Sequence, residues 1–262
     1  MPLGASPLPS LLPPPSGAAL LLDLDGTLLD IAPTPDAVVV APGLPDALTR
    51  LRAHLGGALA VVTGRPLEQV DALLGPVPYA VAGEHGGTIR HAPGAGSVRL
   101  ALPEPPASWL DAAQRVADAH PGVLLERKRR GFVFHYRLAP QLGPMLHEAA
   151  LELIRPAGDH FGLMAAHMAW EVRPRGADKG TAVLSVMAQA PFAGRRPVFI
   201  GDDVTDEDGI RAAQGLGGVG LRVPEAFGDA AGVRAWLAAS AAALDAGGDR
   251  WAPLPMGRCP PG

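Results

Sequence analysis

The stretch that decides the fold of this chain reads LLLDLDGTL, from Leu20 to Leu28. Its apolar run predicts a buried strand that ends at two carboxylates, Asp23 and Asp25, and feeds a tight Gly-Thr turn at the edge of a sheet. Two acids one residue apart repel each other, so the pair favours a hard divalent cation with oxygen ligands. With Mg²⁺ present, one carboxylate can attack phosphorus while the other transfers a proton.

Three other interpretations of this stretch compete with a metal site. An Asp-rich turn can simply cap the helix that follows it, because Asp accepts hydrogen bonds from orphan backbone donors. A calcium loop fits poorly, since the sixth and twelfth positions counted from Asp23 are Leu28 and Thr34 instead of glycine and glutamate. A dinucleotide-binding fingerprint is excluded because the glycine spacing fails.

The composition indicates a soluble globular protein of one large or two modest domains, with 262 residues, 48% hydrophobic and 18% charged. The net charge of −4 gives no basic surface for nucleic acid. The single cysteine, Cys259, offers neither a disulfide framework nor a Cys-based metal site. The Pro-rich start has no Lys or Arg, and no run is long enough to span a bilayer, so we expect a cytoplasmic protein without a signal peptide or membrane partner.

Short apolar strands alternate with helices in the first part of the chain and again in the last third. This alternation predicts an α/β core with a parallel sheet covered on both faces. The expected strands are 18–24, 58–63, 79–82, 197–201 and 217–223, and the expected helices are 44–55, 67–74, 179–189, 206–214 and 229–244.

The alternation of strands and helices is interrupted between these two parts, after a Pro-rich linker at 103–106. A helix, two strands, a second helix and two more strands predict a small α/β unit with an antiparallel sheet, inserted into the core. We expect a core of 18–104 with 174–248, an inserted domain of 105–173, and flexible segments at 1–17 and 249–262.

A second apolar strand also ends in acids, in the stretch VFIGDDVTDE from Val198 to Glu207. Ligands of open parallel sheets bind at the carboxyl ends of the strands, so Asp202, Asp203 and Asp206 are expected to face the same crevice as Asp23. Together they supply enough oxygen ligands for Mg²⁺ with some waters retained. Two unrelated acidic turns are the alternative.

Two further stretches suit a phosphate. Thr63 ends an apolar strand and precedes a helix that starts with a proline, so its hydroxyl and the helix N-terminus can bind a phosphoryl oxygen. Lys179 lies just inside a helix start, where the helix dipole disfavours a cation unless an anion is near. On these stretches alone, a simple N-cap and a solvated surface lysine explain the residues as well.

These motifs occur in the order Asp23–Thr27, Thr63–Arg65, Lys179–Gly180 and Gly201–Glu207, which resembles the four signature motifs of the haloacid-dehalogenase superfamily of phosphatases. Further stretches narrow the resemblance to the trehalose-6-phosphate phosphatases, including residues of their cap domain: 83–86, 125–128, 135–137, 171–176 and 194–203. The resemblance runs from about Ala18 to about Leu237. The chain departs from it in the Pro-rich N-terminal segment and at Ile210, where an aromatic residue is common.

The resemblance implies a Rossmann-like core with an inserted α/β cap, and hydrolysis of trehalose 6-phosphate through an aspartyl-phosphate. Asp23 would attack phosphorus. Asp25 would protonate the leaving sugar oxygen and then activate water. Thr63 and Lys179 would neutralise the phosphoryl oxygens as charge spreads in the transition state.

The resemblance also implies a bound Mg²⁺. Asp23, the backbone carbonyl of Asp25, and Asp202 would be its ligands. Asp203 and Asp206 would hold metal-bound waters.

The inserted domain would act as a lid that recognises the sugar. Glu126, Lys128 and Glu171 suit a disaccharide because charge-assisted hydrogen bonds give strength and direction. Strand alternation puts Glu126 and Lys128 on one face and Arg127 and Arg129 on the other. Arg65 and His85 are further candidates for substrate contact, although His85 can equally serve to pack or to orient its neighbours.

Three other functions are compatible with these residues. The nearest is another sugar phosphatase of the superfamily, for sucrose-phosphate or mannosylglycerate-phosphate. A phosphotransferase would pass the phosphoryl group to a sugar instead of water. A sugar-phosphate sensor without activity is disfavoured, because every expected catalytic position is filled.

Overall fold

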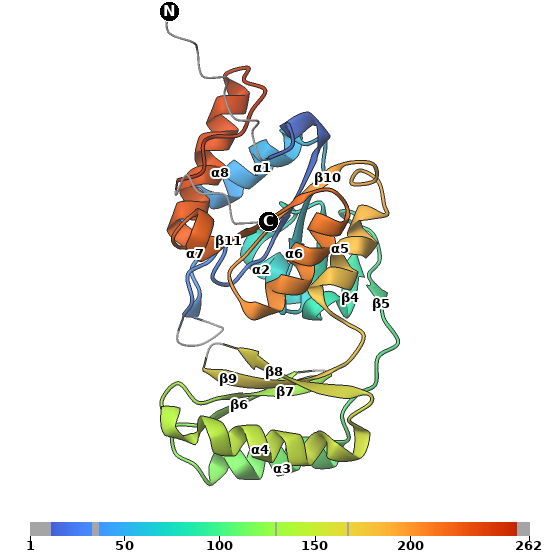
Figure 1. The fold of residues 1–262 in the computed structure, drawn as a ribbon, viewed down its shortest axis with the longest axis vertical. Coiled ribbons are helices and arrows are strands. Elements are labelled where there is room, and N and C mark those ends of the chain that lie inside the picture. The colour runs from blue at the N-terminus through green and yellow to red at the C-terminus, as the bar shows by residue number, and fades with distance from the viewer. Residues whose placement is uncertain (1–11, 33–36, 129, 167, 256–262) are drawn as a thin grey trace, which may run out of the picture. The chain divides into compact units, whose positions relative to one another are not determined.

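The computed structural model describes residues 12–32, 37–128, 130–166 and 168–255, so Cys259 lies outside the described residues. The chain forms two compact units (Figure 1). Among the described residues, the first comprises 12–99, 178–202 and 206–255, and the second comprises 100–177 with 203–205. None of the helices in the described part of the chain is long and apolar enough to cross a membrane.

The first unit is built on a seven-stranded sheet in the order β11-β10-β1-β2-β3-β4-β5. The five strands from β11 to β3 are parallel, whereas β4 and β5 are antiparallel additions at one edge. The strands are β1 (Ala18–Leu22), β2 (Leu59–Val62), β3 (Ala80–Gly83), β4 (Thr88–Arg90), β5 (Val98–Arg99), β10 (Arg196–Gly201) and β11 (Val219–Arg222). The helices are α1 (Leu44–His54), α2 (Leu67–Leu74), α5 (Lys179–Met187), α6 (Glu207–Gly215), α7 (Val223–Ala226) and α8 (Ala230–Asp245).

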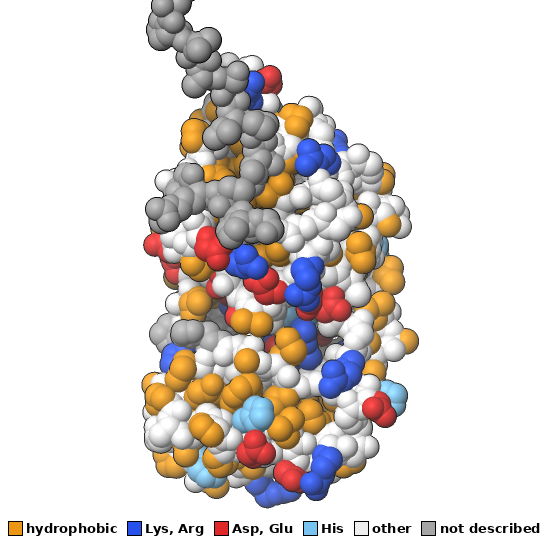
Figure 2. All heavy atoms as spheres, in the orientation of Figure 1, with side chains coloured by type: hydrophobic (Ala, Val, Ile, Leu, Met, Phe, Trp, Pro, Cys, Tyr) orange, Lys and Arg blue, Asp and Glu red, His pale blue; other side chains and the backbone are white. Residues whose placement is uncertain are grey.

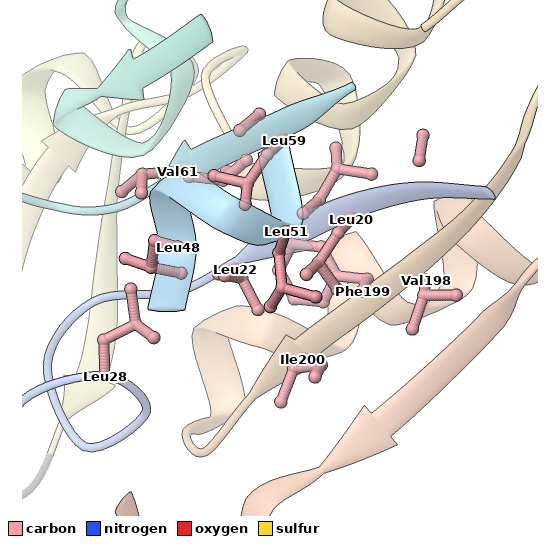
Figure 3. Packing of buried hydrophobic residues seen from close by; sticks show 14 of the residues in the cluster. Leu20, Leu22, Leu28, Leu48, Leu51, Leu59, Val61, Val198, Phe199 and Ile200 are labelled. Carbon is pink, nitrogen blue, oxygen red and sulfur yellow. The ribbon is translucent and has the colours of Figure 1, made fainter. Parts of the chain in front are cut away.

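Helices cover both faces of this sheet, as the continuous apolar strands predict. Leu20 and Leu22 lie on the face that packs against Leu48 and Leu51 of α1 (Figure 3). Side chains alternate along a strand, so Phe199 of β10 points to the opposite face, where its ring lies directly against Gly209 of α6. Helix α8 packs beside α1, and α5 packs beside α6 (Figure 1). The prediction of a parallel α/β core is therefore confirmed, with a mixed edge that the sequence reasoning missed.

The ends of the described chain pack on this unit. Leu12 is buried, and Trp251 stacks on Trp236 with ring centroids 5.4 Å apart. The indole N–H of Trp251 donates to the carbonyl of Pro13 at 2.7 Å. These residues belong to the segments expected to be flexible, yet aromatic stacking and buried apolar area hold them on the core. Their remaining residues, 1–11 and 256–262, lie outside the described part.

The second unit is a four-stranded antiparallel sheet in the order β6-β7-β9-β8, with both of its helices on one face (Figure 1). Its elements are α3 (Ala107–Asp118), β6 (Leu124–Lys128), β7 (Gly131–His135), α4 (Gly143–Ile154), β8 (Phe161–Ala166) and β9 (Ala169–Pro174). Phe132 and Phe134 point toward the helices and are fully buried. The predicted cap fold, a small α/β unit with an antiparallel sheet, is confirmed.

The surface in view carries no continuous basic area. Figure 2 shows basic side chains next to acidic ones over the first unit. This mixture agrees with the net charge of −4.

Candidate active site

Three neighbouring strands of the first unit bring the predicted site residues to one edge of the sheet. Asp23 follows β1, Asp202 follows β10, and Thr63 follows β2. Because β10, β1 and β2 are adjacent and parallel, their carboxyl ends meet at the same edge. The backbone N–H of Asp23 donates to the Ile200 carbonyl at 2.9 Å, which ties two of the three strand ends together.

Asp23, Asp202 and Asp206 form a cluster of carboxylates. Each offers an oxygen within 4.8 Å of the others, and Asp23 and Asp206 are almost completely buried. The backbone N–H of Asp202 donates to Oδ2 of Asp206 at 3.1 Å, which holds the two acids of this loop in register. Such an all-oxygen donor set suits a hard divalent cation. The cluster can therefore hold a divalent metal ion.

Lys179 lies against two of these acids. Helix α5 begins at this residue, after Asp178 caps the helix through a reciprocal pair of hydrogen bonds with Thr181. The Lys179 Nζ lies 2.6 Å from Oδ1 of Asp23 and 2.6 Å from Oδ1 of Asp206, and the lysine is 3% exposed. The two anions offset the unfavourable position of a cation at a helix N-terminus.

Burial and neighbouring charges shift the pKa values of Asp23 and Lys179. Desolvation raises the pKa of Asp23 well above its ordinary value, and the charges of Asp206 and Asp202 raise it further, while Lys179 opposes the change. Burial alone would lower the pKa of Lys179, but the carboxylates of Asp23 and Asp206 outweigh it, so this pKa is raised. The lysine therefore stays charged, whereas burial favours the neutral form of Asp23 as long as no further cation lies beside it.

Thr27 is a member of the site that sequence reasoning did not assign. It is fully buried, and its hydroxyl lies 3.4 Å from Oδ2 of Asp23 and 3.3 Å from Oδ1 of Asp202. The sequence feature that could have identified Thr27 is its place in the turn directly after Asp25. Gly26 in the same turn has φ +78°, and a Cβ at this glycine would overlap the Asp202 carboxylate, so the turn accepts only glycine.

Asp25 is bound by Arg65, one residue after the Thr63-Gly64 turn. The guanidinium donates from Nε to Oδ2 and from Nη2 to Oδ1 of Asp25, both at 2.7 Å. Its Nη1 also donates to Oε1 of Gln69 at 3.2 Å. Arg65 was expected to contact substrate, and this stays a prediction; in this structure its guanidinium holds both carboxylate oxygens of Asp25.

His85 is buried beside the same turn and is 8% exposed. Its backbone N–H donates to the Thr63 carbonyl at 2.9 Å, and a Cβ at Gly64 would lie 2.6 Å from its Nε2. Asp203 lies outside the cluster of three acids, and its Oδ1 accepts from the Val204 N–H at 2.6 Å.

The second unit presents a polar row on the face of its sheet opposite the helices. Glu126 of β6 aligns with Val133, which in turn aligns with Glu171 of β9. Lys128 donates to Oε1 of Glu171 at 2.9 Å, and Nε2 of His135 lies 2.9 Å from Oε2 of Glu126. Glu126 and Lys128 share this face, as strand alternation predicts, while Arg129 lies outside the described residues.

These pairs favour the charged forms of Glu126 and Lys128. The hydrogen bond from His135 lowers the pKa of Glu126. Burial works to lower the pKa of Lys128, but the charges of Glu171 and Glu126 raise it overall. Fixed, ionised groups of this kind can hydrogen-bond the hydroxyls of a sugar.

The parallel sheet with acidic strand ends and the inserted antiparallel unit have the fold and the site residues expected of the haloacid-dehalogenase superfamily of phosphatases. The model of the trehalose-phosphatase family matches residues 21–225. A probable trehalose-phosphate phosphatase of Sinorhizobium fredii is 44% identical over 206 residues, which cover 78% of this chain and 77% of that protein. The trehalose-6-phosphate phosphatase of Escherichia coli is 38% identical over 210 residues, with 78% and 77% covered.

A solved structure shows the same fold. The C-terminal domain of the Candida albicans trehalose-6-phosphate phosphatase aligns with a TM-score of 0.69 at 24% identity and covers 77% of this chain and 74% of that one. The chain belongs to the trehalose-phosphatase family, and it is a phosphoric monoester hydrolase.

Proposed function

We propose that this protein hydrolyses trehalose 6-phosphate to trehalose and inorganic phosphate, as a step of trehalose biosynthesis. The observation that carries the proposal is the buried Asp23 carboxylate at a strand end, with Lys179 on one oxygen and Asp202 in the same cluster. The names of the curated relatives support the substrate.

Asp23 attacks phosphorus, and the bond from phosphorus to the sugar oxygen breaks as an aspartyl-phosphate forms. Asp25 gives the leaving sugar oxygen its proton. Water then attacks the aspartyl-phosphate, and Asp25 takes the proton that water loses, so the enzyme returns to its first state. Lys179 and Thr63 stabilise the phosphoryl oxygens as negative charge moves onto them.

Mg²⁺ is the cation that the acidic cluster suits best. Asp23, Asp202 and the Asp25 backbone carbonyl would hold it, because oxygen atoms are the ligands that Mg²⁺ prefers. Asp206, which lies in the same cluster, would hold a metal-bound water. When bound, Mg²⁺ supplies positive charge that lets an anionic phosphate approach an anionic nucleophile. Asp203 would support a metal-bound water from the edge of the cluster.

Phosphate release is expected to depend on a divalent cation. Protein treated with a chelator should release no phosphate from trehalose 6-phosphate, and Mg²⁺ should restore release, because the uncompensated carboxylates repel the substrate. The measurement is phosphate release from a panel of trehalose 6-phosphate, sucrose 6-phosphate, mannosylglycerate phosphate and glucose 6-phosphate, with no added acceptor.

The outcomes of this panel separate the alternatives. We expect the highest kcat/KM with trehalose 6-phosphate. A higher kcat/KM with another sugar phosphate would identify that compound as the preferred substrate. No phosphate release in the panel, together with transfer of the phosphoryl group to a sugar added afterwards, would indicate a phosphotransferase. Full activity of the chelated protein would contradict the metal site.

Glu126 is expected to recognise the sugar and not the phosphate. Glu126→Ala should lower kcat/KM for trehalose 6-phosphate by about 10- to 100-fold, since a hydrogen bond to a charged group contributes about 1.5–3 kcal/mol. Turnover of p-nitrophenyl phosphate, which has no sugar, should stay near wild type. Glu152→Ala is the matched control, because Glu152 pairs with Arg155 on the helical side of the same unit. An equal loss on both substrates would argue against sugar recognition.

A further inference from the structure

Arg65 and Asp25 form a two-point ion pair inside the first unit. Both guanidinium contacts to the Asp25 oxygens are 2.7 Å long, and the Arg65 side chain is only 12% exposed. A bidentate pair of this kind fixes the plane of the carboxylate as well as its position. Gln69, at the start of α2, accepts a third hydrogen bond from the same guanidinium. The orientation of Asp25 is thus set by Arg65.

The backbone of Arg65 is itself held by an unusual turn. The N–H groups of Glu84 and His85 donate to the carbonyls of Arg65 and Thr63 at 3.0 and 2.9 Å. Both donors are left-handed, with φ 52° and 55°, although neither is glycine. The left-handed conformation costs about 1–2 kcal/mol for a residue with a side chain. Strain of this kind persists where surrounding contacts impose it, and it concentrates at functional sites.

Side chains lock the same turn. The Thr88 hydroxyl donates to Oε2 of Glu84 at 2.7 Å. The His85 imidazole lies against Gly64, leaving no room for a Cβ there. The peptide units on either side of Gly64 therefore cannot move without displacing His85, and Arg65 is held at its base as well as at its guanidinium.

We propose that Arg65 is a positioning residue that orients the Asp25 carboxylate for proton transfer, and that the left-handed turn at Glu84–His85 fixes Arg65 in place. This inference rests on the function proposed above, in which Asp25 is the acid and then the base. Proton transfer requires the carboxylate to be within hydrogen-bond reach of the oxygen that leaves. A carboxylate released from Arg65 would sample other rotamers, so transfer would become slow.

The test uses the dependence of kcat/KM on the leaving group, because a good leaving group needs no proton. Arg65→Gln should barely change kcat/KM for 2,4-dinitrophenyl phosphate. It should lower kcat/KM for phenyl phosphate by roughly 100-fold, the lower range of what a general acid contributes. Asp25→Asn should show the same dependence, and adding Arg65→Gln to it should cause little further loss, since the two residues act as one unit.

Arg90→Gln is the matched control. Arg90 makes an equivalent bidentate pair with Asp71, at 2.7 and 2.8 Å, and neither residue belongs to the acidic cluster. Its removal should leave the dependence on the leaving group as in wild type. This variant reports any general effect of losing a partly buried arginine.

Three results would overturn the positioning role. If Arg65→Gln lowered kcat/KM equally for all aryl phosphates, Arg65 would act on the phosphoryl group instead. A loss confined to trehalose 6-phosphate would assign it to the sugar. A multiplicative loss in the double variant would make the two residues independent. Failure of the wild-type protein to hydrolyse any of these esters would instead contradict the proposed function, so the two failures are distinguishable.

Discussion

Asp23→Asn is expected to abolish phosphate release from every substrate while the protein keeps its fold. An amide is a poor nucleophile toward phosphorus, and no other carboxylate follows β1 directly at this point of the sheet edge. The uncatalysed hydrolysis of phosphate monoesters is so slow that enzymes accelerate it by up to ~10²¹-fold. Loss of the nucleophile should therefore bring turnover below detection. The measurement is phosphate release with Mg²⁺ present.

The same variant should be at least as stable as wild type when metal is absent. Burial raises the pKa of Asp23, so the stability that this carboxyl contributes is fully present below its unfolded pKa and is lost as the pH rises through its folded pKa. Asparagine carries no charge to bury, and Lys179 keeps Asp206 as its partner. The unfolding free energy, measured at neutral pH with a chelator present, should therefore not fall.

Asp71→Asn is the control for this pair of measurements, because Asp71 is an exposed acid paired with Arg90. It should keep wild-type turnover. Turnover by Asp23→Asn that resembles this control would exclude Asp23 as the nucleophile. A large loss of stability without metal would show that the ionised carboxylate is favourable where it lies.

The order of the acidic strands explains why the sequence predicted so much of the site. Asp23 and Asp202 are far apart in the chain, but each follows an apolar strand, and parallel strands put their carboxyl ends at one edge. That rule needs no coordinates. It predicted from the sequence that Asp23, Asp202 and Thr63 lie at the same edge of the sheet.

Features set by tertiary contacts were out of reach of the same reasoning. The strands β4 and β5 have three and two residues, too few to show any alternation of apolar side chains. The pairing of Arg65 with Asp25 depends on how two loops meet, and the left-handed turn at Glu84–His85 runs against the preference of both residues. A pattern in the sequence reports propensity, and here contacts override it.

The lysines of this chain carry a compositional signal of their own. The chain contains 22 basic residues of the Lys and Arg type, and only Lys128 and Lys179 are lysines. Each lies among carboxylates, Lys128 on Glu171 in the second unit and Lys179 on two acids in the first. A compact ammonium can approach several carboxylates where a planar guanidinium would demand a fixed fork. In an arginine-rich chain, a lysine was therefore a clue to a site.

Lys179→Met is expected to cause the largest loss of stability among these variants. Lys179, Asp23 and Asp206 are all buried, and removing the cation leaves two carboxylates facing each other without compensation. Breaking a buried ion pair by deleting one partner costs about 3–5 kcal/mol, because the remaining charge stays desolvated. We expect a decrease of this size in the unfolding free energy, measured by urea denaturation with a chelator present. Turnover should be lost as well.

Two further variants, Lys128→Met and the double variant of Lys179→Met with Asp206→Asn, serve as controls for this result. Lys128→Met removes a cation that has one carboxylate partner and a side chain 28% exposed, so its loss of stability should be smaller. Adding Asp206→Asn to Lys179→Met removes one of the two uncompensated charges and should recover part of the stability, which apolar packing alone would not predict. Mg²⁺ should also stabilise Lys179→Met more than wild type, since it supplies the missing positive charge at the same carboxylates. Equal losses for the two lysine variants, with no recovery in the double variant, would mean that Lys179 acts through its methylene chain and not through its charge.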